Sequence, residues 1–348
     1  MKAVVFKDIN SLVFEERENP RIEKESDIIL EVTLTTICSS DIHIKKGFVP
    51  KAKKGIILGH EFVGIIKEKG KDVKKFNVGD RVAVNCETFC GECFYCKKGY
   101  VNNCSDKNGG WALGCRIDGG QGEFVRIPFA DNCLTEIPDS VTDEEALFTG
   151  DLLSTGYWAC KIGEILKEDI IVVIGAGPTG LCTMMCARLF EPKKIIAVDI
   201  DDGRLNLAKE KGYADIIINS EKENVKNEIL RLTDMRGADK VFEVAGGKET
   251  FSKAIDIARP NAIVVLVAMY EENQVLPLPE IYGKNLTIKF GGVDGIYCEE
   301  IMKYIEDKKI DATPLITHRL DFEDIMRGYD IFENKKDGVI KIAVKVKR

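Results

Sequence analysis

The second half of the chain alternates apolar runs with helical patterns, and this alternation constrains the fold more than any other feature. The run DIIVVIGAG at 169–177 is followed by the helical pattern PTGLCTMMCARLF at 178–190, and the apolar run KKIIAVDID at 193–201 comes next. The same alternation continues to about residue 292. Strand, helix and strand in succession predict a parallel sheet of the doubly wound α/β class.

The first half has a different texture. Short β-rich segments such as IILEVTLTTI at 28–37 and FVGIIKEKG at 62–70 are separated by turns rich in glycine and asparagine, which is typical of a β-barrel. The tail combines a helical pattern with a closing strand and is expected to pack back on this barrel. A chain of 348 residues exceeds the usual size of one core. We therefore predict one domain from residues 1–152 and 292–348, and a second from 153–291.

Composition excludes several classes of partner. The net charge of -7 argues against a protein that binds a nucleic-acid backbone. The N-terminal residues lack the apolar core of a secretion signal, and no window approaches the length of apolar sequence that spans a bilayer, so no membrane is expected. The twelve cysteines are clustered as in metal-binding proteins of the reducing cytosol, and a cytoplasmic location is expected.

Four cysteines lie at the spacing of a structural zinc site. In CGECFYCKKGYVNNC, three cysteines are separated by two residues each and a fourth follows eight residues later, which suits one tetrahedral zinc. Cys86 is an alternative ligand, although its gap to the next cysteine fits less well. The predicted structural ligands are Cys90, Cys93, Cys96 and Cys104. The other cysteines outside the motifs are expected to be small buried residues: Cys115, Cys133, Cys160, Cys182, Cys186 and Cys298.

A second metal site is predicted from three separate motifs. Cys38 in ICSSDIH, His60 in GHE and Asp151 in TGDLLSTG are ligand types that suit a catalytic zinc with an open position. The chain has only three histidines, and two of them, His43 and His60, fall in these short motifs. Alternatively, Asp151 is the N-cap of a helix that begins near Thr155.

The sequence VVIGAGPTG predicts a dinucleotide site. Its glycines follow a strand and open a helix, where they permit a tight turn and a close approach of pyrophosphate to the helix N-terminus. Asp199 ends the next strand, where a carboxylate binds the ribose hydroxyls and repels a 2′-phosphate, so NAD is preferred to NADP. Arg204 can instead pair with that phosphate, or cover the ribose or adenine. Thr155 can cap its helix or touch the nicotinamide. The predicted cofactor residues are Thr155, Gly175, Gly177, Pro178, Thr179, Gly180, Asp199 and Arg204.

Together these motifs resemble the zinc-dependent medium-chain dehydrogenases of the alcohol dehydrogenase superfamily over nearly the whole chain. GHEFVGIIKEKGKDV, FNVGDRV, the cysteine cluster, STG and GAGPTG follow one another in the family order. The resemblance is nearest to the bacterial secondary-alcohol and formaldehyde-dehydrogenase-like branches. It implies a chaperonin-10-like β-barrel with a Rossmann domain, one catalytic and one structural zinc per subunit, and NAD-linked, reversible oxidation of a small secondary or primary alcohol to a ketone or aldehyde. It also implies a homotetramer or a dimer.

The resemblance extends to individual residues. It implies that Cys38, His60 and Asp151 bind the catalytic zinc and that Glu61 approaches it as an exchangeable fourth ligand. The Ser40 hydroxyl can accept the alcohol proton, and the resemblance implies that His43 relays it to solvent. Asp41 fits a carboxylate that orients His60. Trp111 matches a tryptophan that lines the substrate pocket. The plainer alternatives are turn or cap residues for Ser40 and Asp41, a surface histidine for His43 and a buried loop anchor for Trp111.

Other functions remain open at this stage. Sorbitol, butanediol and threonine dehydrogenases share most of these motifs. Enoyl and quinone reductases of the same superfamily generally lack both zinc sites. A nonenzymatic protein that binds nucleotide and zinc would be expected to have lost part of the motif set, which is complete here. A zinc-knuckle protein that binds nucleic acid would conflict with the acidic charge.

Overall fold

The computed structural model describes residues 1–346 of the chain. These residues form two compact units. Unit 1 comprises residues 1–154 and the described residues from 293 onward, and unit 2 comprises residues 155–292. Helix α4 (Leu152–Gly163) begins in unit 1 and continues into unit 2. Within residues 1–346, no helix is both long and apolar enough to cross a membrane.

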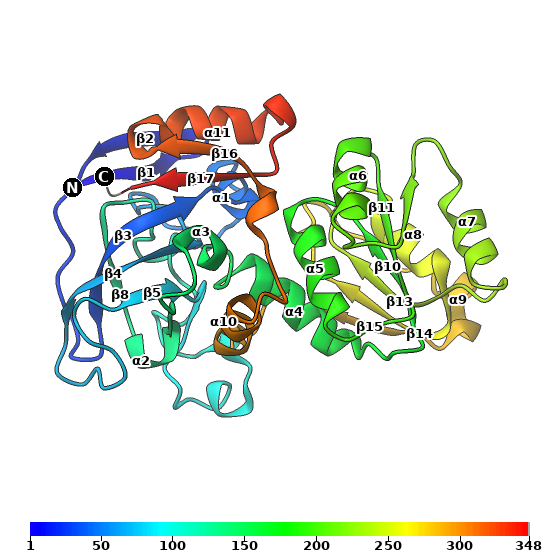
Figure 1. Cartoon of the computed structure of the whole chain (residues 1–348), viewed down its shortest axis with the longest axis horizontal. Helices are drawn as coiled ribbons and strands as arrows, with labels where there is room; N and C mark the ends of the chain where they lie inside the picture. Colours follow the sequence, from blue (N-terminus) through cyan, green and yellow to red (C-terminus); the bar gives the residue numbers. More distant parts are fainter. Residues whose placement is uncertain (347–348) are drawn as a thin grey trace. The chain divides into compact units, whose positions relative to one another are not determined.

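Unit 2 is built on a parallel sheet of six strands, drawn in green to orange in Figure 1. Every pairing between neighbouring strands is parallel. Numbered along this unit, the strand order is 3-2-1-4-5-6, which is the order of dinucleotide-binding doubly wound folds. The predicted parallel sheet is therefore confirmed. In spatial order the strands are β12 (Ile216–Asn219), β11 (Lys194–Asp199), β10 (Ile170–Ile174), β13 (Ala238–Glu243), β14 (Ala258–Leu266) and β15 (Thr287–Phe290).

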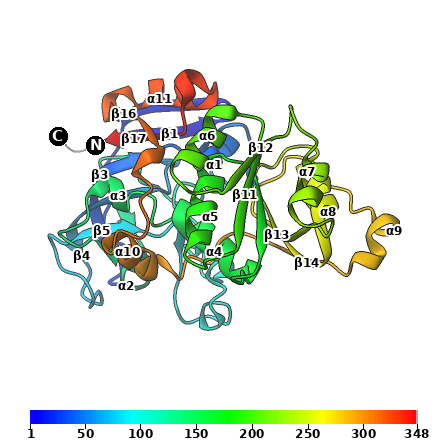
Figure 2. The ribbon, with the colours of Figure 1, turned by 45° about the vertical axis from the view of Figure 1, so that its right-hand side comes forward.

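Helices cover both faces of this sheet. Figure 2 shows α5 and α6 on one face and α7 and α8 on the other. Every residue of β10 and β13 is buried, as expected for central strands that are covered on both sides. β10 is apolar throughout, whereas β13 also buries Asp239, Lys240 and Glu243. The helical elements are α5 (Pro178–Arg188), α6 (Asp202–Glu210), α7 (Val225–Leu232), α8 (Thr250–Ile257), α9 (Leu278–Ile281) and the 3-10 turn η3 (Tyr282–Lys284).

The main sheet of unit 1 joins the N-terminal half to the C-terminal tail. Strand β17 of the tail pairs antiparallel with β3, and β3 pairs antiparallel with β4, so the tail packs back on the first half as predicted. The apolar faces of these strands form the cores of unit 1. Within the described residues, the strands in spatial order are β16 (Ile316–Asp321), β17 (Lys341–Lys345), β3 (Ile28–Thr36), β4 (Phe62–Lys69), β5 (Arg81–Val84) and β9 (Leu134–Glu136), and β8 (Phe124–Ile127) pairs with β3.

Smaller elements surround this sheet. β1 (Lys2–Asp8) forms an antiparallel hairpin with β2 (Ser11–Glu16), and β6 (Glu87–Thr88) pairs antiparallel with β7 (Gly110–Trp111) across the cysteine-rich segment. The α-helices of unit 1 are α1 (Ser39–Lys45), α2 (Ala130–Cys133), α3 (Asp143–Ala146), α10 (Cys298–Glu306) and α11 (Ile325–Glu333). The 3-10 turns are η1 (Cys96–Lys98), η2 (Val101–Asn103), η4 (Thr313–Leu315), η5 (Phe322–Asp324) and η6 (Lys336–Gly338).

The tail contains more structure than the predicted helix and closing strand. A second strand, β16, and a second helix, α11, lie between α10 and β17, and Figure 1 shows α11 beside β16. Gly328 in the middle of α11 weakens the helical pattern in the sequence. The structure explains this glycine, because a Cβ there would lie 3.1 Å from side-chain atoms of Ile37 and Leu320.

Candidate functional site

Neighbouring strands bring two of the predicted metal-binding motifs together. Cys38 follows β3, and His60 and Glu61 directly precede β4. Because β3 and β4 are antiparallel, with Thr35 opposite Phe62, the end of one strand lies beside the start of the other. The backbone N–H of Thr36 donates to the carbonyl of Glu61 at 3.2 Å. Sheet register therefore places the GHE motif next to Cys38.

Asp151 reaches the same place through a close backbone contact. The carbonyl of Gly150 accepts a hydrogen bond from the N–H of Cys86 at 3.0 Å. A Cβ on Gly150 would lie 1.8 Å from the carbonyl oxygen of Val84, so only glycine fits beside β5. Asp151 follows this glycine and directly precedes α4.

The four side chains converge as a metal site requires. One ligand atom each from Cys38, His60, Glu61 and Asp151 lies within 4.8 Å of the others. The Asp151 Oδ2 atom is 3.5 Å from His60 Nε2 and 3.9 Å from Cys38 Sγ. A tetrahedral zinc with ligand distances of about 2.0–2.3 Å separates its ligand atoms by about 3.3–3.8 Å. A thiolate, an imidazole and a carboxylate thus fit zinc in both chemistry and spacing.

Asp41 lies beside His60, on the side of the imidazole opposite Asp151. Its Oδ1 atom lies 3.4 Å from His60 Nδ1, while its Oδ2 atom accepts the Cys38 N–H at 3.0 Å. Gln121 donates to the same Oδ2 at 3.0 Å, and the Tyr329 hydroxyl donates to Gln121 at 2.6 Å. This buried chain fixes Asp41 and leaves Nε2 of His60 directed at Asp151. Sequence reasoning did not identify Gln121 or Tyr329, because neither lies in a ligand motif.

The charges of His60 and Asp151 support each other. Burial lowers the pKa of His60, but the Asp41 charge and hydrogen bonds with Asp151 and Asp41 outweigh it, so the pKa lies well above the ordinary value. Burial raises the pKa of Asp151, but hydrogen bonding and charge from His60 outweigh it and lower the pKa overall. A positive charge between the two groups is therefore favoured, and a metal ion would supply it in place of the imidazole proton.

Glu61 has a partner that sequence reasoning missed. Lys341 on β17 contacts Glu61 Oε1 at 2.7 Å, and both side chains are 1% exposed. The carboxylates of Glu61 and Asp151 and the Cys38 sulfur hold the pKa of Lys341 above its ordinary value against the effect of burial. Glu61 Oε2 is buried and has no hydrogen-bond partner. One oxygen of Glu61 is thus held by Lys341, and the other remains available to a ligand.

The predicted proton-relay residues lie on one short helix. Ser40 and His43 are three residues apart on α1 and are both half-buried, whereas Cys38 before the helix is buried. The Ser40 hydroxyl is 3.7 Å from Cys38 Sγ. The His43 ring packs against Phe48 with centroids 6.1 Å apart. Residues three apart lie on the same face of a helix, so Ser40 and His43 share one face of α1.

Trp111 and Cys86 both adjoin the cluster. The indole of Trp111 lies edge to face against the His60 ring at 5.6 Å, and its buried Nε1 has no hydrogen-bond partner. Trp111 also packs on a core cluster of unit 1, so its position is compatible with both predicted roles, a buried loop anchor and a wall of the substrate pocket.

The thiol of Cys86 is buried and hydrogen bonds to Asp151. Burial, followed by the Asp151 charge, raises the pKa of this thiol. Cys86 is therefore not part of the four-cysteine cluster, and that alternative was wrong.

The four predicted structural cysteines form their own cluster. Their sulfur atoms lie within 4.8 Å of one another. Three of the distances are 3.4, 3.6 and 3.9 Å, close to the spacing of about 3.8 Å expected around one zinc at 2.3 Å from each sulfur. The N–H of Cys96, together with other hydrogen bonds, lowers the pKa of Cys93 to about 5, which favours the thiolate form that binds zinc. The six remaining cysteines predicted to be buried are all buried, which confirms that prediction.

The glycine fingerprint of unit 2 has the local geometry its spacing predicts. Gly175 has φ +106°, which favours glycine, and it abuts Ala245 of the neighbouring strand's loop. Around the ideal Cβ position of Gly177 there is open space except for an Arg204 nitrogen at 3.9 Å. A Cβ on Gly180 would lie 1.9 Å from the Gly175 carbonyl. Gly175 thus allows the tight turn, Gly177 leaves room for a ligand to approach the backbone, and Gly180 allows α5 to pack closely. Pro178 and Thr179 are the first two residues of α5.

Asp199 is tied to this turn. One oxygen accepts the N–H of Ala176 at 2.6 Å, and the other accepts the N–H groups of Ile200 and Asp201. A carboxylate has about four acceptor positions, so one remains for a ribose hydroxyl.

Arg204 lies in the first turn of α6, near Gly177. Thr155 lies inside α4, which begins three residues earlier, so the alternative that Thr155 caps this helix was wrong.

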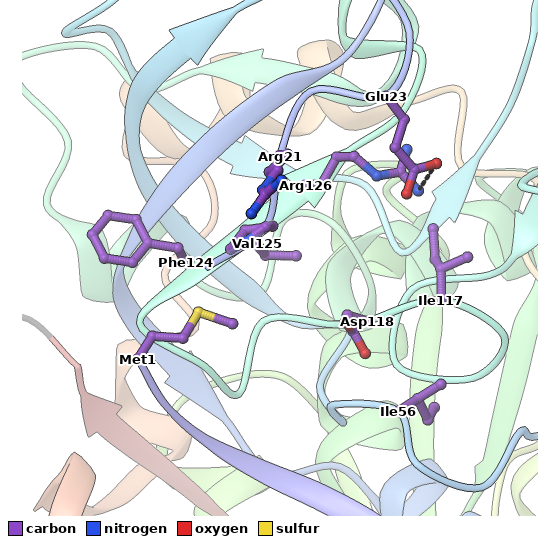
Figure 3. A pocket seen from close by; sticks show the side chains of 10 residues that line it. Met1, Arg21, Glu23, Ile56, Ile117, Asp118, Phe124, Val125 and Arg126 are labelled. Carbon is purple, nitrogen blue, oxygen red and sulfur yellow. Dashed lines mark ion pairs between the residues drawn. The ribbon is translucent and has the colours of Figure 1, made fainter. Parts of the chain in front are cut away.

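A separate pocket of about 270 Å³ lies on unit 1, and the residues that line it include Met1, Ile56 and Phe124 (Figure 3). Figure 3 shows the ion pair between Arg126 and Glu23 at its rim. None of the residues predicted to bind zinc, cofactor or substrate lines this pocket. We assign it no role.

Comparison with known proteins gives consistent matches. A family model described as an alcohol dehydrogenase GroES-like domain matches residues 24–139, and a zinc-binding dehydrogenase model matches residues 178–305. An alcohol dehydrogenase from Cupriavidus necator is 34% identical over 367 residues, covering 99% of this chain and 98% of its own.

Solved structures agree with these matches. A zinc-dependent alcohol dehydrogenase 2 from Streptococcus pneumonia, in its apo form, has a TM-score of 0.94 and 35% identity, covering 100% of this chain and 99% of its own. A protein described as a short chain alcohol dehydrogenase from E. coli CFT073, complexed with NADH, has a TM-score of 0.90 and 28% identity, with 99% of each chain covered. The predicted pairing of a chaperonin-10-like domain with a Rossmann domain is thereby confirmed. The chain belongs to the zinc-dependent medium-chain dehydrogenase/reductase family and is an oxidoreductase that acts on alcohols.

Proposed function

We propose that the protein is an NAD-linked dehydrogenase that interconverts a small secondary or primary alcohol and its ketone or aldehyde, with one catalytic and one structural zinc per chain. The observation that carries this proposal is the convergence of Cys38, His60 and Asp151 at zinc-ligand spacing. Residues 1–152 and 292–348 would form the catalytic domain, and residues 153–291 the NAD-binding domain. The predictions for the individual site residues remain part of this proposal.

The residues of unit 1 provide the parts of an alcohol oxidation. Zinc bound by Cys38, His60 and Asp151 would act as a Lewis acid that favours loss of the alcohol proton, and a bound nicotinamide would take up the hydride from carbon. The Ser40 hydroxyl would accept the proton, and His43 would pass it to solvent. Asp41 would keep the His60 ring in position. Trp111, beside His60, would form part of the substrate wall.

Lys341 adds control over Glu61. The ion pair holds one Glu61 oxygen, so the carboxylate can turn its free Oε2 toward the cluster without leaving its partner. Glu61 would thus complete the zinc coordination when no substrate is bound and withdraw when substrate arrives. The positive charge of the buried Lys341 would offset part of the negative charge that Glu61, Asp151 and Cys38 place around the metal.

NAD is the proposed cofactor of unit 2. The acceptor position left on Asp199 would bind a ribose hydroxyl, and its charge would repel a 2′-phosphate. Arg204 near Gly177 would cover the adenosine half. The structure of the E. coli relative with NADH supports a nicotinamide cofactor. Thr155 would contact the nicotinamide.

The substrate, assembly and location are also proposed. A small alcohol is preferred, and a polyol, butanediol or threonine is the alternative within the family. The family resemblance supports a homotetramer or dimer, and the clustering of cysteines around metal sites supports a cytoplasmic location.

Kinetics with a ligand variant test this function. NADH formation at 340 nm should be measured across a panel of small alcohols and polyols for wild type and Asp151→Ala, with zinc counted per chain, and NADP should be compared with NAD. We expect alcohol-dependent turnover with NAD and about two zincs in wild type, and loss of turnover together with one zinc in the variant. Turnover that survives in Asp151→Ala with unchanged zinc, or no turnover in zinc-loaded wild type on any alcohol of the panel, would contradict the proposal.

A further inference from the structure

Glu243 is a fully buried carboxylate at the carboxyl end of β13, and none of the roles above uses it. Its Oε1 atom accepts the N–H groups of Ala245 and Gly246, both at 2.9 Å. Its Oε2 atom accepts the hydroxyl of Tyr270 at 2.5 Å. A buried polar group costs free energy unless it is hydrogen bonded, and the three donors fix Glu243 in one position.

The position of Glu243 in the sheet points to the nucleotide. The chain runs from β10 outward to β11 and β12 and then crosses back to β13 on the other side of β10. Ligands of open α/β sheets bind at the carboxyl ends of the strands where the order reverses, which here lies between β10 and β13. The loops that follow these two strands are in contact, because an ideal Cβ on Gly175 would lie 3.1 Å from Ala245.

The other half of the sheet indicates which part of the dinucleotide lies near Glu243. Asp199 ends β11, and the glycine turn follows β10, so the adenosine ribose belongs over β11 and the pyrophosphate over β10. Neighbouring strands are only about 4.8 Å apart. A bound dinucleotide that runs from β11 to β10 must therefore continue toward β13. Its nicotinamide half then lies over the ends of β13 and β14.

Glu243 joins the two loops at those ends. Its backbone carbonyl accepts the N–H groups of Val267 and Ala268, which follow β14, at 2.9 and 3.3 Å. Its side chain holds the loop after β13 from one side and Tyr270, farther along the loop after β14, from the other. Gly246, with φ +68°, fits closely against this second loop, because a Cβ there would lie 2.8 Å from the Met269 carbonyl.

We propose that Glu243 and Tyr270 are positioning residues for the nicotinamide half of the cofactor, acting through the backbone of the loops after β13 and β14. This inference rests on the proposed use of NAD. If so, substitutions of Glu243 or Tyr270 should leave the affinity for a dinucleotide fragment that lacks the nicotinamide unchanged.

The test compares two ligands on the zinc-loaded protein. Binding of NADH is measured by nicotinamide fluorescence, and binding of ADP-ribose, which lacks the nicotinamide, by calorimetry. We expect Glu243→Ala to weaken NADH binding about tenfold or more and to change ADP-ribose binding less than about twofold. Tyr270→Phe removes only a hydroxyl and should weaken NADH binding by a smaller factor, about threefold. Glu243→Gln keeps an acceptor for the two backbone N–H groups and should restore most of the NADH affinity.

The opposite end of the same strand provides a matched control. Asp239 is also buried on β13, accepts the N–H of Ile170 at 2.8 Å and pairs with Arg259 at 2.6 Å. Asp239→Asn should lower the melting temperature while leaving the ratio of NADH to ADP-ribose affinity unchanged. A ratio that moves as much in Asp239→Asn as in Glu243→Ala would mean that the ratio reports only stability and would overturn the inference.

Other outcomes also decide the matter. Equal weakening of both ligands in Glu243→Ala, or no weakening of either in Glu243→Ala and Tyr270→Phe, would refute a positioning role. If Glu243→Ala does not fold, Tyr270→Phe alone carries the comparison. Wild-type protein that binds neither NADH nor ADP-ribose would refute the proposed cofactor itself. Tight binding of both without alcohol turnover would refute the proposed function while leaving this inference standing.

Discussion

Replacing Lys341 by methionine should destabilise the protein strongly, because it leaves Glu61 as an uncompensated buried carboxylate. Lys341 Nζ contacts Glu61 Oε1 at 2.7 Å and also donates to the Ile37 carbonyl at 3.0 Å. Both charged side chains are 1% exposed, so water cannot replace the lost partner. Methionine fills a similar volume without a charge, and the change therefore removes the ion pair together with the hydrogen bond to Ile37 while leaving the packing largely intact.

The magnitude follows from the burial of the pair. Removing one partner of a buried ion pair costs about 3–5 kcal/mol. For a unit of this size, 1 kcal/mol corresponds to a shift of about 2–4 °C in melting temperature, so the loss should be about 6–20 °C. The loss should be smaller with zinc bound, because the ion would offset part of the Glu61 charge.

Thermal unfolding of the zinc-free and zinc-loaded forms provides the assay. The double variant Glu61→Gln with Lys341→Met removes both charges and should recover at least half of the lost stability. Lys345→Met, at the exposed end of the same strand, is the matched control and should cost no more than about 0.5 kcal/mol. A cost below about 1 kcal/mol for Lys341→Met in the zinc-free form, or no recovery in the double variant, would refute this reasoning.

Three further predictions concern other parts of the protein. Asp41→Asn should weaken zinc binding at the His60 site or lower turnover about 10–100-fold, because Asp41 orients the His60 ring; a chelator titration would show this, and Ser39→Ala on the same helix is its control. Cys96→Ser should remove one zinc per chain while Cys115→Ser removes none, as measured by elemental analysis; equal zinc in both variants would show that the four-cysteine cluster holds no metal. Hydrogen bonds from Lys308 and the Thr142 N–H lower the pKa of Glu145 from 4.5 to about 2, so this group adds stability that is complete above about pH 4.5 and is lost as the pH falls toward 2. The difference in denaturation midpoint between wild type and Lys308→Met should accordingly vanish near pH 2, and a difference that persists there would count against this assignment.

The parallel sheet of unit 2 was predictable from sequence because its central strands are buried on both faces. That environment requires uninterrupted apolar runs such as IIVVI in β10, and these are easily recognised. The convergence of Cys38, His60 and Asp151 was predictable for another reason. Cysteine, histidine and aspartate are restricted to a few positions by the chemistry of zinc, so the three motifs could be linked although Cys38 and Asp151 are far apart in sequence.

Features that depend on tertiary packing were not predictable. Lys341 lies in an apolar strand, where a lysine is normally assigned to the exposed face, and only the pairing of β17 with β3 brings it to Glu61. Gln121 contacts Asp41 and Tyr329 contacts Gln121, and no local pattern in the sequence encodes the proximity of these three segments. The start of α4 was misplaced because no apolar period distinguishes Leu152 from Thr155 as its first residue.

The most direct test of the account is the location of zinc in crystals of this protein. Anomalous difference maps collected on either side of the zinc absorption edge identify the metal and its ligands together. The account predicts two zinc peaks per chain, one among Cys38, His60 and Asp151 and the other among Cys90, Cys93, Cys96 and Cys104. A chain with saturating zinc that shows a peak only at the four cysteines would contradict the proposed catalytic site.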